Sequence, residues 1–347
     1  MTGWKAPSHT SRDSPRRFSP LHRLPTGGAI LCFHSITPSR SDEHGDAHLS
    51  LDDFVSCVGI ARRWGEFVPL SELIARHRQG RSTSGLLAAT FDDGYAALQG
   101  EFKRFVERER IPIAIFVVTG AATSGKTYWW DRVDNLFPRT PGERWRRFEE
   151  VCGVSDAYRA GQPRAYGPLR PLRQWILATY AGLWPRHLED ELERLEGEVG
   201  YKTRQRAMTF AELSQIDKMP GVEIGVHTVS HPVLPLLAEA DLQKEIQDAH
   251  DALREHLENT IPVLAVPFGL YDERTLRLAA AAGMVASLTL SGETLGATFQ
   301  SSVPRMCITK TDARAKLNLR LLGVPSLLRA CVGRRPEPFP ALPSATT

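Results

Sequence analysis

Short apolar runs alternate along this chain with longer segments in which apolar residues recur every three or four positions. The runs at 29–35, 86–91, 111–118, 222–226, 262–268 and 284–290 predict buried strands. The amphipathic segments at 50–64, 96–110, 210–219, 238–259 and 272–283 predict helices, and 66–80 predicts a short strand followed by a helix. This alternation indicates βα units that form a parallel sheet or barrel.

Two of the expected helices carry start signals. Ser50 and Thr209 stand at N-terminal cap positions, each followed three residues later by an acidic residue, Asp53 or Glu212. These pairs place the helix starts at 51 and 210.

The alternation stops between about 125 and 206, where amphipathic segments are joined by Pro- and Gly-rich stretches. We expect a helical insertion here. Residues 1–27, rich in Pro, Ser and Arg, are expected to be disordered and 323–347 to form a C-terminal tail. One domain would then span 28–322, with the apolar stretch after 317 as a packed helix.

The composition is that of a globular protein and argues against several classes. The chain has 347 residues and a net charge of +3 from 43 basic and 40 acidic residues, which is too balanced to favour nucleic acid binding. No apolar run is long enough to span a membrane, and the N-terminal stretch lacks the apolar centre of a secretory signal, so we expect a cytoplasmic protein. The five cysteines form no C-x-x-C pair, which favours reduced thiols.

Three predicted strands end in residues capable of chemistry. The strands at 86–91, 222–226 and 262–268 end in the motifs TFDDGY, HTVSH and VPFG. Ligands bind at the carboxyl ends of the strands in parallel α/β folds, so we expect the motifs to lie together. Taken singly, Asp-Asp-Gly is common in turns and His-x-x-x-His is also found as two surface or core histidines, so the argument depends on their joint placement.

Asp93, His227 and His231 would together form a two-histidine, one-carboxylate metal site. Such a set leaves ligand positions open for water and substrate, and a divalent cation offsets the charge of a buried carboxylate. Asp92 points the other way on an extended chain and is a candidate general base beside the metal. Apart from His34, the remaining histidines are expected in loops or on polar helix faces, without a role: His9, His22, His44, His48, His77, His187, His250 and His256.

In this order, the three motifs resemble those of the polysaccharide deacetylase family, carbohydrate esterase family 4, over about 29–309. The resemblance implies an α/β fold, a distorted (β/α)7-like barrel, here with the helical insertion. The segment YWWDRVDNLF is similar to a bacterial branch linked to cell-surface polysaccharide biosynthesis. The implied activity is hydrolysis of N-acetyl groups on amino sugars of a polysaccharide or its precursor, with a divalent cation, expected to be Zn²⁺.

Two alternatives to this activity stay open. The protein could be an O-acetyl carbohydrate esterase, or a sugar-binding protein without turnover. In each case the expected partner is an acetylated carbohydrate, N-acetylated in the favoured case, rather than nucleic acid.

Matched position by position, the resemblance keeps the three candidate ligands and the candidate base in those roles. It also implies that the backbone N–H of Phe268, in VPFG, is the oxyanion donor. Many members have an Arg three residues before the Pro of this motif, where this chain has Leu264. Arg305 is a candidate to tune Asp92 instead, with a structural salt bridge as the alternative.

The leaving amine also needs a general acid. Many family members use a histidine late in the chain, but none follows His256 here. His34, in LCFHSI at the end of strand 29–35, resembles the N-terminal acid of members with a permuted strand order. The alternative is a core histidine satisfied by the backbone.

The stretch GAATSGKT, Gly120 to Thr127, matches the phosphate-binding loop pattern. A bulky aromatic segment follows it and the only strand ending in two acidic residues precedes it, so we interpret it as a loop beside the active site rather than a nucleotide site.

The tryptophans of the insertion have two interpretations. They either shape a sugar groove or pack the insertion's own core. These residues are Trp129, Trp130, Trp145, Trp175 and Trp184.

Overall fold

The computed structural model describes residues 27–37, 47–160, 170–310 and 317–322. The expectations for 1–26 and 323–347 lie outside these ranges. The strands are β1 (Ala29–Phe33), β2 (Ser35–Thr37), β3 (His48–Ser50), β4 (Glu66–Phe67), β5 (Leu86–Phe91), β6 (Ile113–Val117), β7 (Val222–Val226), β8 (Thr260–Ala265), β9 (Ala286–Thr289), β10 (Ser302–Pro304) and β11 (Met306–Cys307). The α-helices are α1 (Leu51–Ala61), α2 (Leu70–Arg78), α3 (Glu101–Glu109), α4 (Thr119–Ala122), α5 (Trp129–Leu136), α6 (Gly142–Val151), α7 (Asp156–Ala160), α8 (Arg170–Thr179), α9 (Glu189–Val199), α10 (Phe210–Asp217), α11 (Glu239–His256), α12 (Glu273–Ala281) and α13 (Leu317–Leu321).

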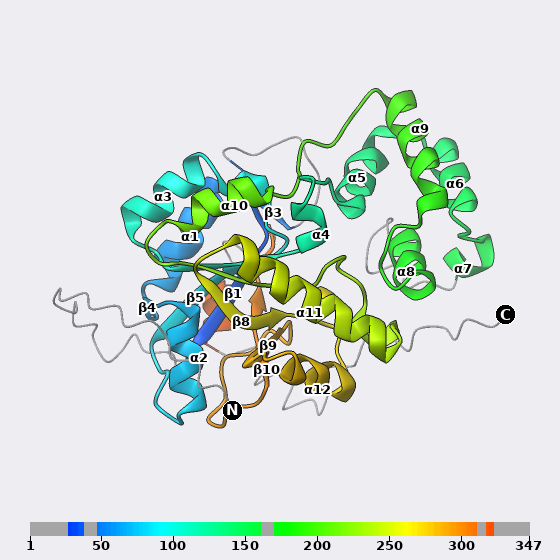
Figure 1. The fold of residues 1–347 in the computed structure, drawn as a ribbon. Helices are drawn as coiled ribbons and strands as arrows, with labels where there is room; N and C mark the ends of the chain where they lie inside the picture. Colours follow the sequence, from blue (N-terminus) through cyan, green and yellow to red (C-terminus); the bar gives the residue numbers. More distant parts are fainter. Residues whose placement is uncertain (1–26, 38–46, 161–169, 311–316, 323–347) are drawn as a thin grey trace.

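The main sheet is parallel and closes into a barrel (Figure 1). Its order is β1, β5, β6, β7, β8, β9 and β10, and β11 returns to pair with β1. Only Arg305 separates β10 from β11, so these two act as halves of one strand and the barrel has seven strand positions. The expected distorted (β/α)7-like barrel is confirmed. The closing strand, which the sequence pattern did not predict, is too short in each half to give a periodic signal.

Alternate residues of each barrel strand point inward. In β1, Ile30 belongs to the inner apolar cluster that α2 closes at the amino-terminal end. Its neighbour Leu31 packs outside the barrel, with side chains of α1. The same alternation places Cys32 and, just after β5, Asp92 on the inner side. The barrel interior therefore changes from apolar to polar toward the carboxyl ends of the strands.

Helices pack on the outside of the barrel, and two of them begin as predicted. The Ser50 side chain accepts a hydrogen bond from the Asp53 N–H at the start of α1, and Thr209 begins α10 with a capping box. One expectation differs, because the helix predicted at 96–110 is broken. Gly100, with φ of 69°, separates a 3-10 turn from α3, a backbone conformation that favours glycine.

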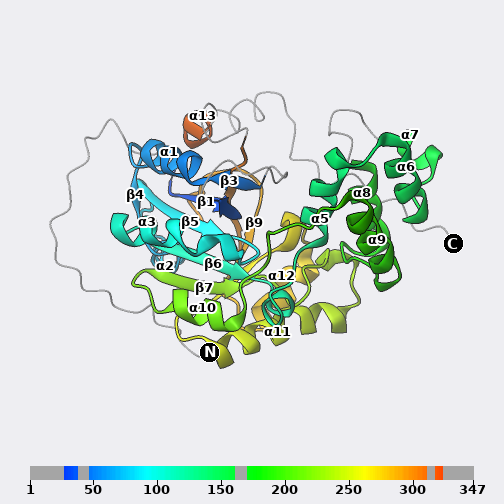
Figure 2. The same cartoon turned by 90° about the horizontal axis from the view of Figure 1, so that it is seen from above.

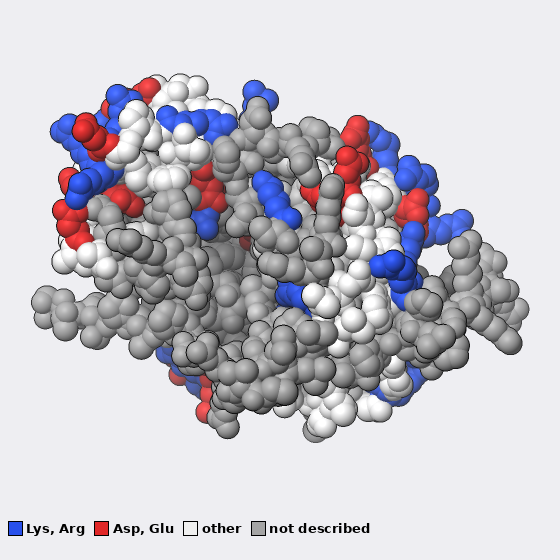
Figure 3. Space-filling model, turned by 180° about the vertical axis from the view of Figure 1, so that it is seen from behind, with Lys and Arg blue, Asp and Glu red and all other residues white. Residues whose placement is uncertain are grey.

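Helices α5 to α9 interrupt the alternation and gather at one side of the barrel, as Figures 1 and 2 show from two directions. They enclose a separate apolar cluster that includes Trp145 and Leu192. Ion pairs such as that between Arg194 and Glu198 lie on the insertion. Where Figure 3 colours the surface, acidic and basic side chains lie next to one another. The helical insertion is confirmed.

The described cysteines agree with the expectation of reduced thiols. Cys32, Cys57 and Cys152 are buried and Cys307 is half-buried, and all four are free. Cys331 lies outside the described ranges. Within those ranges, the structure contains no helix that is both long and apolar enough to span a membrane.

Candidate metal centre and active site

The carboxyl ends of the barrel strands open into a cavity of about 390 Å³. The strand-end motifs border it on one side and the insertion, through α5 and α8, on the other. A larger hollow of about 820 Å³ lies beside α2 and the amino-terminal ends of β6 and β7, and it contains none of the motif residues. The smaller cavity is therefore the candidate site. The motif and insertion residues around it include His34, Asp92, Asp93, Trp130, His227, His231 and Phe268.

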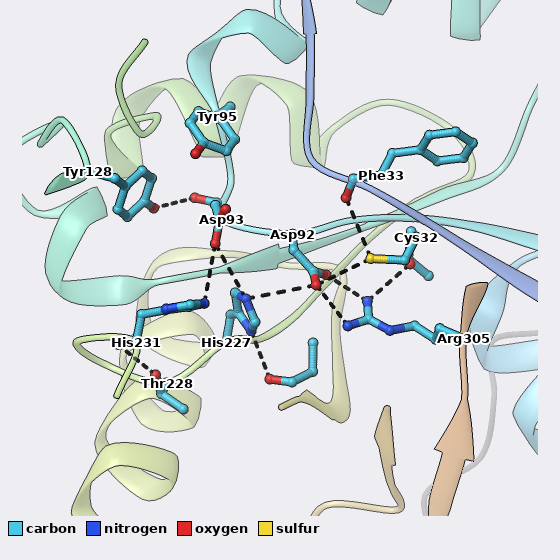
Figure 4. Close-up of polar contacts among 12 residues, drawn as sticks. Cys32, Phe33, Asp92, Asp93, Tyr95, Tyr128, His227, Thr228, His231 and Arg305 are labelled. Carbon is cyan, nitrogen blue, oxygen red and sulfur yellow. Dashed lines mark hydrogen bonds and ion pairs between the residues drawn. The ribbon is translucent and has the colours of Figure 1, made fainter. Parts of the chain in front are cut away.

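Asp93, His227 and His231 converge in this cavity (Figure 4). The Oδ1 atom of Asp93 lies 3.4 Å from Nε2 of His227 and 3.7 Å from Nε2 of His231. Ligand atoms around a tetrahedral ion with bonds of about 2.0–2.2 Å lie about 3.4 Å apart, so the spacing suits a shared cation. All three side chains are buried, and Asp93 Oδ1 accepts no hydrogen bond from the described residues. The donor set fits a divalent cation such as Zn²⁺.

The backbone at this cluster is held in uncommon conformations. Asp93, Thr228, His231 and Phe268 all have positive φ angles, of 68°, 67°, 61° and 57°. Each such conformation costs on the order of 1 kcal/mol for a residue with a side chain. Specific contacts stabilise it: the Tyr128 hydroxyl donates to the Asp93 carbonyl at 2.5 Å, and the His231 N–H donates to Thr228 Oγ1 at 3.0 Å. Strain of this kind concentrates at functional sites.

Both histidines direct Nε2 at Asp93, and a backbone contact fixes this orientation for His227. Nδ1 of His227 lies 2.8 Å from the Ala265 carbonyl oxygen and donates to it, which leaves the Nε2 lone pair directed at Asp93. Burial, followed by the charge of His227, lowers the pKa of His231 to about 3. Burial also acts to lower the pKa of His227, but the charge of Asp92 and the contact with Asp93 raise it overall. The raised pKa favours a proton on Nε2 of His227, and a divalent cation would take the place of that proton.

Asp92 lies on the other side of the strand end and is bound by Arg305 (Figure 4). Nη1 and Nη2 of Arg305 lie 2.7 and 2.8 Å from the two carboxylate oxygens, and both side chains are buried. Burial alone would raise the pKa of Asp92, but the charge of Arg305, aided by that of His227, holds it well below its usual range. Asp92 is therefore ionised at neutral pH. Leu264 is a core residue, so the arginine beside this carboxylate comes from the closing strand instead.

His34 follows β1 and borders the cavity. Its Nδ1 atom is buried and has no hydrogen-bond partner in the described part of the chain, which does not favour a core histidine satisfied by the backbone. Two thiols lie beside it. A hydrogen bond from Cys32 lowers the pKa of Cys307 to about 6, an effect that burial opposes and the charge of His34 supports. Oδ2 of Asp92, at 3.4 Å from Cys32 Sγ, is an alternative acceptor for the same thiol proton.

Aromatic side chains form one wall of the cavity. The ring centroids of Phe268 and Trp130 lie 4.5 and 4.9 Å from that of His231. Trp130 also stacks on Tyr128, with 4.5 Å between centroids. All five tryptophans belong to the apolar cluster of the insertion or pack against it, as the second interpretation expects. Trp129 and Trp130 also border the cavity, and a sugar groove there stays a prediction.

A polar network that the sequence pattern did not predict lies beside this wall. Asp131 is buried, with Nε2 of His48 at 2.7 Å and the Tyr95 hydroxyl at 2.7 Å from its two oxygens. The expectation that His48 lies in a loop or on a polar helix face is wrong, because it is a buried residue of β3 that borders the cavity. A three-residue strand gives no periodic signal. The polar position of Asp131 within the aromatic run YWWDRV was the available hint.

The phosphate-loop pattern forms an ordinary connection. Its first residues belong to the short helix α4, and the Lys126 N–H donates to the Ala121 carbonyl at 3.1 Å. The Lys126 carbonyl accepts from the Ala207 N–H at 2.9 Å, while its side chain is exposed. These contacts fit the loop interpretation, and the absence of nucleotide binding stays a prediction.

Comparison of the sequence with family models gives one match. Residues 200–287 match the model of the family described as polysaccharide deacetylase. This segment contains β7, β8 and three of the residues at the site, His227, His231 and Phe268. No curated protein sequence matches the chain.

Solved structures share the fold at low sequence identity. A deacetylase of Streptococcus pyogenes, PplD in complex with acetate, has 16% identity and a TM-score of 0.54, covering 84% of this chain and 95% of that one. IcaB from Ammonifex degensii has 16% identity and a TM-score of 0.54, covering 86% of this chain and 97% of that one. A polysaccharide deacetylase from Bacillus cereus has 10% identity and a TM-score of 0.52, covering 85% and 68%. These similarities establish the barrel fold.

The buried acid–histidine cluster lies at the carboxyl ends of the strands of a parallel α/β barrel, where barrel enzymes have their active sites. The family model agrees with the resemblance that the motifs carry: residues 200–287, which include the second and third motifs, match a polysaccharide deacetylase domain.

Proposed function

We propose that this protein is a metal-dependent deacetylase that removes N-acetyl groups from amino sugars of a polysaccharide or its precursor. The observation that carries the proposal is the convergence of Asp93, His227 and His231 beside an ionised Asp92 in one cavity. The similarity to structures named as deacetylases, one of them in complex with acetate, supports it. The link to cell-surface polysaccharide and the cytoplasmic location stay predictions.

Asp93, His227 and His231, which are buried and border the cavity, would hold the cation. When bound, a divalent cation supplies Lewis-acid chemistry: it polarises the acetyl carbonyl and lowers the pKa of water. The contact of His227 Nδ1 with the Ala265 carbonyl fixes the ring orientation, so both the ligand atom and its direction are set before the substrate arrives.

Asp92 acts as the general base. Its carboxylate accepts the proton of the attacking water, and Arg305 holds both oxygens so that the carboxylate keeps one orientation. Arg305 also keeps Asp92 ionised despite burial, and the ring of Phe116 lies 5.6 Å from the guanidinium carbon on the inner side of the barrel.

His34 and Phe268 complete the set of catalytic groups. The imidazole of His34 borders the cavity from β1 and gives a proton to the leaving amine, which is a poor leaving group until it is protonated. The backbone N–H of Phe268, in a turn with positive φ after β8, stabilises the oxyanion. The face of Trp130 offers an apolar surface for a sugar ring next to His231.

The test is release of acetate from N-acetylglucosamine oligomers by the metal-loaded protein and by Asp92→Asn. We expect Asp92→Asn to keep its fold and lose turnover by about 10²–10⁴-fold. Asp248→Asn, an exposed acid on α11, is the matched control and should retain activity. An O-acetylated glycan is assayed in parallel: hydrolysis of the ester alone would favour the esterase alternative. Turnover of neither substrate by the loaded protein would favour sugar binding without catalysis.

A further inference from the structure

A second cluster of potential metal ligands lies beside the candidate metal centre. Cys32 and Cys307 face each other in the pairing of β1 with β11, and His34 follows two residues after Cys32. One ligand atom from each of these residues lies within 4.8 Å of the others. Cys307 belongs to β11, the last described strand in the sequence, which lies beside β1 only when the barrel is closed. The cluster therefore exists only in the closed fold.

We propose that Cys32, His34 and Cys307 form a second metal site that binds a thiophilic divalent cation such as Zn²⁺ or Cd²⁺. Two sulfur atoms and one imidazole nitrogen are the ligand types that such cations prefer over carboxylate and water. This donor set differs from that of Asp93, His227 and His231, so the two sites should differ in metal preference.

The site has a ligand atom without a hydrogen-bond partner, and the cavity gives a cation access to it. Nδ1 of His34 is buried without a hydrogen-bond partner among the described residues, an atom whose desolvation a metal or a proton donor would offset. His34 and Cys307 border the 390 Å³ cavity, and Cys32 lies behind them, fully buried. A cation can therefore enter through the same cavity as the substrate.

The local charge favours a divalent ion over none. Arg305 would repel a cation by itself, but it is paired with Asp92. When Cys32 and Cys307 bind as thiolates, their two negative charges balance the two positive charges of the ion. The cluster then carries no net charge, which is the state that a buried site tolerates best.

Occupation of this site has a consequence for catalysis that rests on the proposed function. A ring nitrogen of His34 that binds a cation can no longer carry the proton for the leaving amine. Excess thiophilic cation should therefore inhibit deacetylation, by about 10-fold or more, and a chelator should reverse the effect. The first cation activates the enzyme and the second one switches it off.

The experiment uses full-length protein that is stripped of metal, kept reduced with a phosphine and titrated with Cd²⁺. The readouts are the metal content after desalting and the ultraviolet charge-transfer band of cadmium thiolates. We expect about two ions per chain and a thiolate band in the unaltered protein. Cys307→Ser should bind about one ion without the band, and His231→Ala should bind about one ion with the band. Cys152→Ser, in the insertion, should behave as the unaltered protein.

The crossed variants separate this proposal from the proposed function. No thiolate band in the unaltered protein, or a band that persists in Cys307→Ser, would overturn the second site while leaving the deacetylase assay untouched. Should Cys307→Ser fail to fold by circular dichroism, Cys307→Ala serves the same purpose without a polar group in the half-buried position. Loss of deacetylation with an intact band would count against the proposed function alone.

Discussion

The guanidinium of Arg305 and the carboxylate of Asp92 form two hydrogen bonds, of 2.7 and 2.8 Å, inside the barrel. The two residues are 213 positions apart, and the pair exists because the closing strand returns to β1, next to β5. Barrel closure and the ionisation of Asp92, the candidate base, therefore depend on the same contact. A change at Arg305 should affect stability and activity together.

We predict that Arg305→Met destabilises the protein by about 3–5 kcal/mol, because it leaves a buried carboxylate unpaired. Urea unfolding measures this loss. The matched control is Arg62→Met, which breaks a pair with Glu109 whose side chains are 42% and 30% exposed and should cost about 1 kcal/mol or less. The double variant with Asp92→Asn should lose less than the sum of the single losses. Equal costs for Arg305→Met and Arg62→Met would contradict the pairing.

A second prediction concerns the metal ligands. His231→Ala should lose the cation held with Asp93 and His227 and, with it, deacetylation, because two remaining ligands hold a divalent ion weakly. Metal analysis and acetate release measure the two effects in protein that also carries Cys307→Ser, so that the second cluster holds no ion. His187→Ala, an exposed histidine of the insertion, is the control in the same background. Equal metal content in the two variants would remove the site from this cluster.

The apolar pattern predicted a parallel sheet or barrel and the meeting of the motifs, and the family resemblance implied the barrel. Strands at 86–91 and 222–226 are long enough for an apolar pattern, and parallel strands present their carboxyl ends at one face. That rule alone predicts that Asp93 and His227 lie near each other. It needs no knowledge of the loops between them.

The parts that the sequence did not predict depend on closure and on short elements. Arg305 was a candidate partner of Asp92, but it stands between strands of three and two residues, so nothing local indicates that it points into the barrel. His48 occupies a strand of three residues, and its partner Asp131 comes from the insertion 83 positions later. Contacts of this kind are set by tertiary packing, which local periodicity does not encode.

Lys126 should be dispensable, which is a third prediction. It lies in an exposed loop held by backbone contacts to Ala121 and Ala207. Lys126→Ala should keep normal deacetylation, and calorimetry with ATP should show no binding to the unaltered protein. Micromolar ATP binding that disappears in Lys126→Ala would reverse this interpretation of the loop.

A fourth prediction concerns acid stability at the start of α10. Hydrogen bonds from Arg206, opposed by burial and supported by Thr209, lower the pKa of Glu212 to about 2 from 4.5. A lowered folded-state pKa means that the carboxylate stabilises the protein above about pH 4.5, and that this contribution is lost as the pH falls toward about 2. The side chains of Arg206 and Glu212 are 41% and 29% exposed, so solvent screening reduces the contribution to about 1 kcal/mol.

Urea unfolding of Glu212→Gln and the unaltered protein over this pH range measures the difference. The cost of the substitution should be largest near neutral pH and shrink as the pH falls below about 4.5. Arg206→Gln should reproduce most of the effect, since it removes the principal partner. If the loss of stability in Glu212→Gln does not change with pH, the Glu212 side chain stabilises the start of α10 through its shape and not through its charge.

The last prediction concerns His34. Its imidazole borders the cavity just after β1. Its Nδ1 atom is buried and makes no hydrogen bond to the described residues, so this atom does not stabilise the fold through such a bond. His34→Ala should keep the fold and the cation held by Asp93, and should lose turnover by about 10²–10⁴-fold, because the amine then leaves unprotonated. Substrates with a better leaving group provide the sharper readout: an O-acetyl or activated aryl ester needs less proton donation, so the loss should be much smaller there. An equal loss on amide and ester substrates would indicate a positional defect, and normal turnover of the amide in a folded, metal-loaded His34→Ala would assign the proton donor to another group.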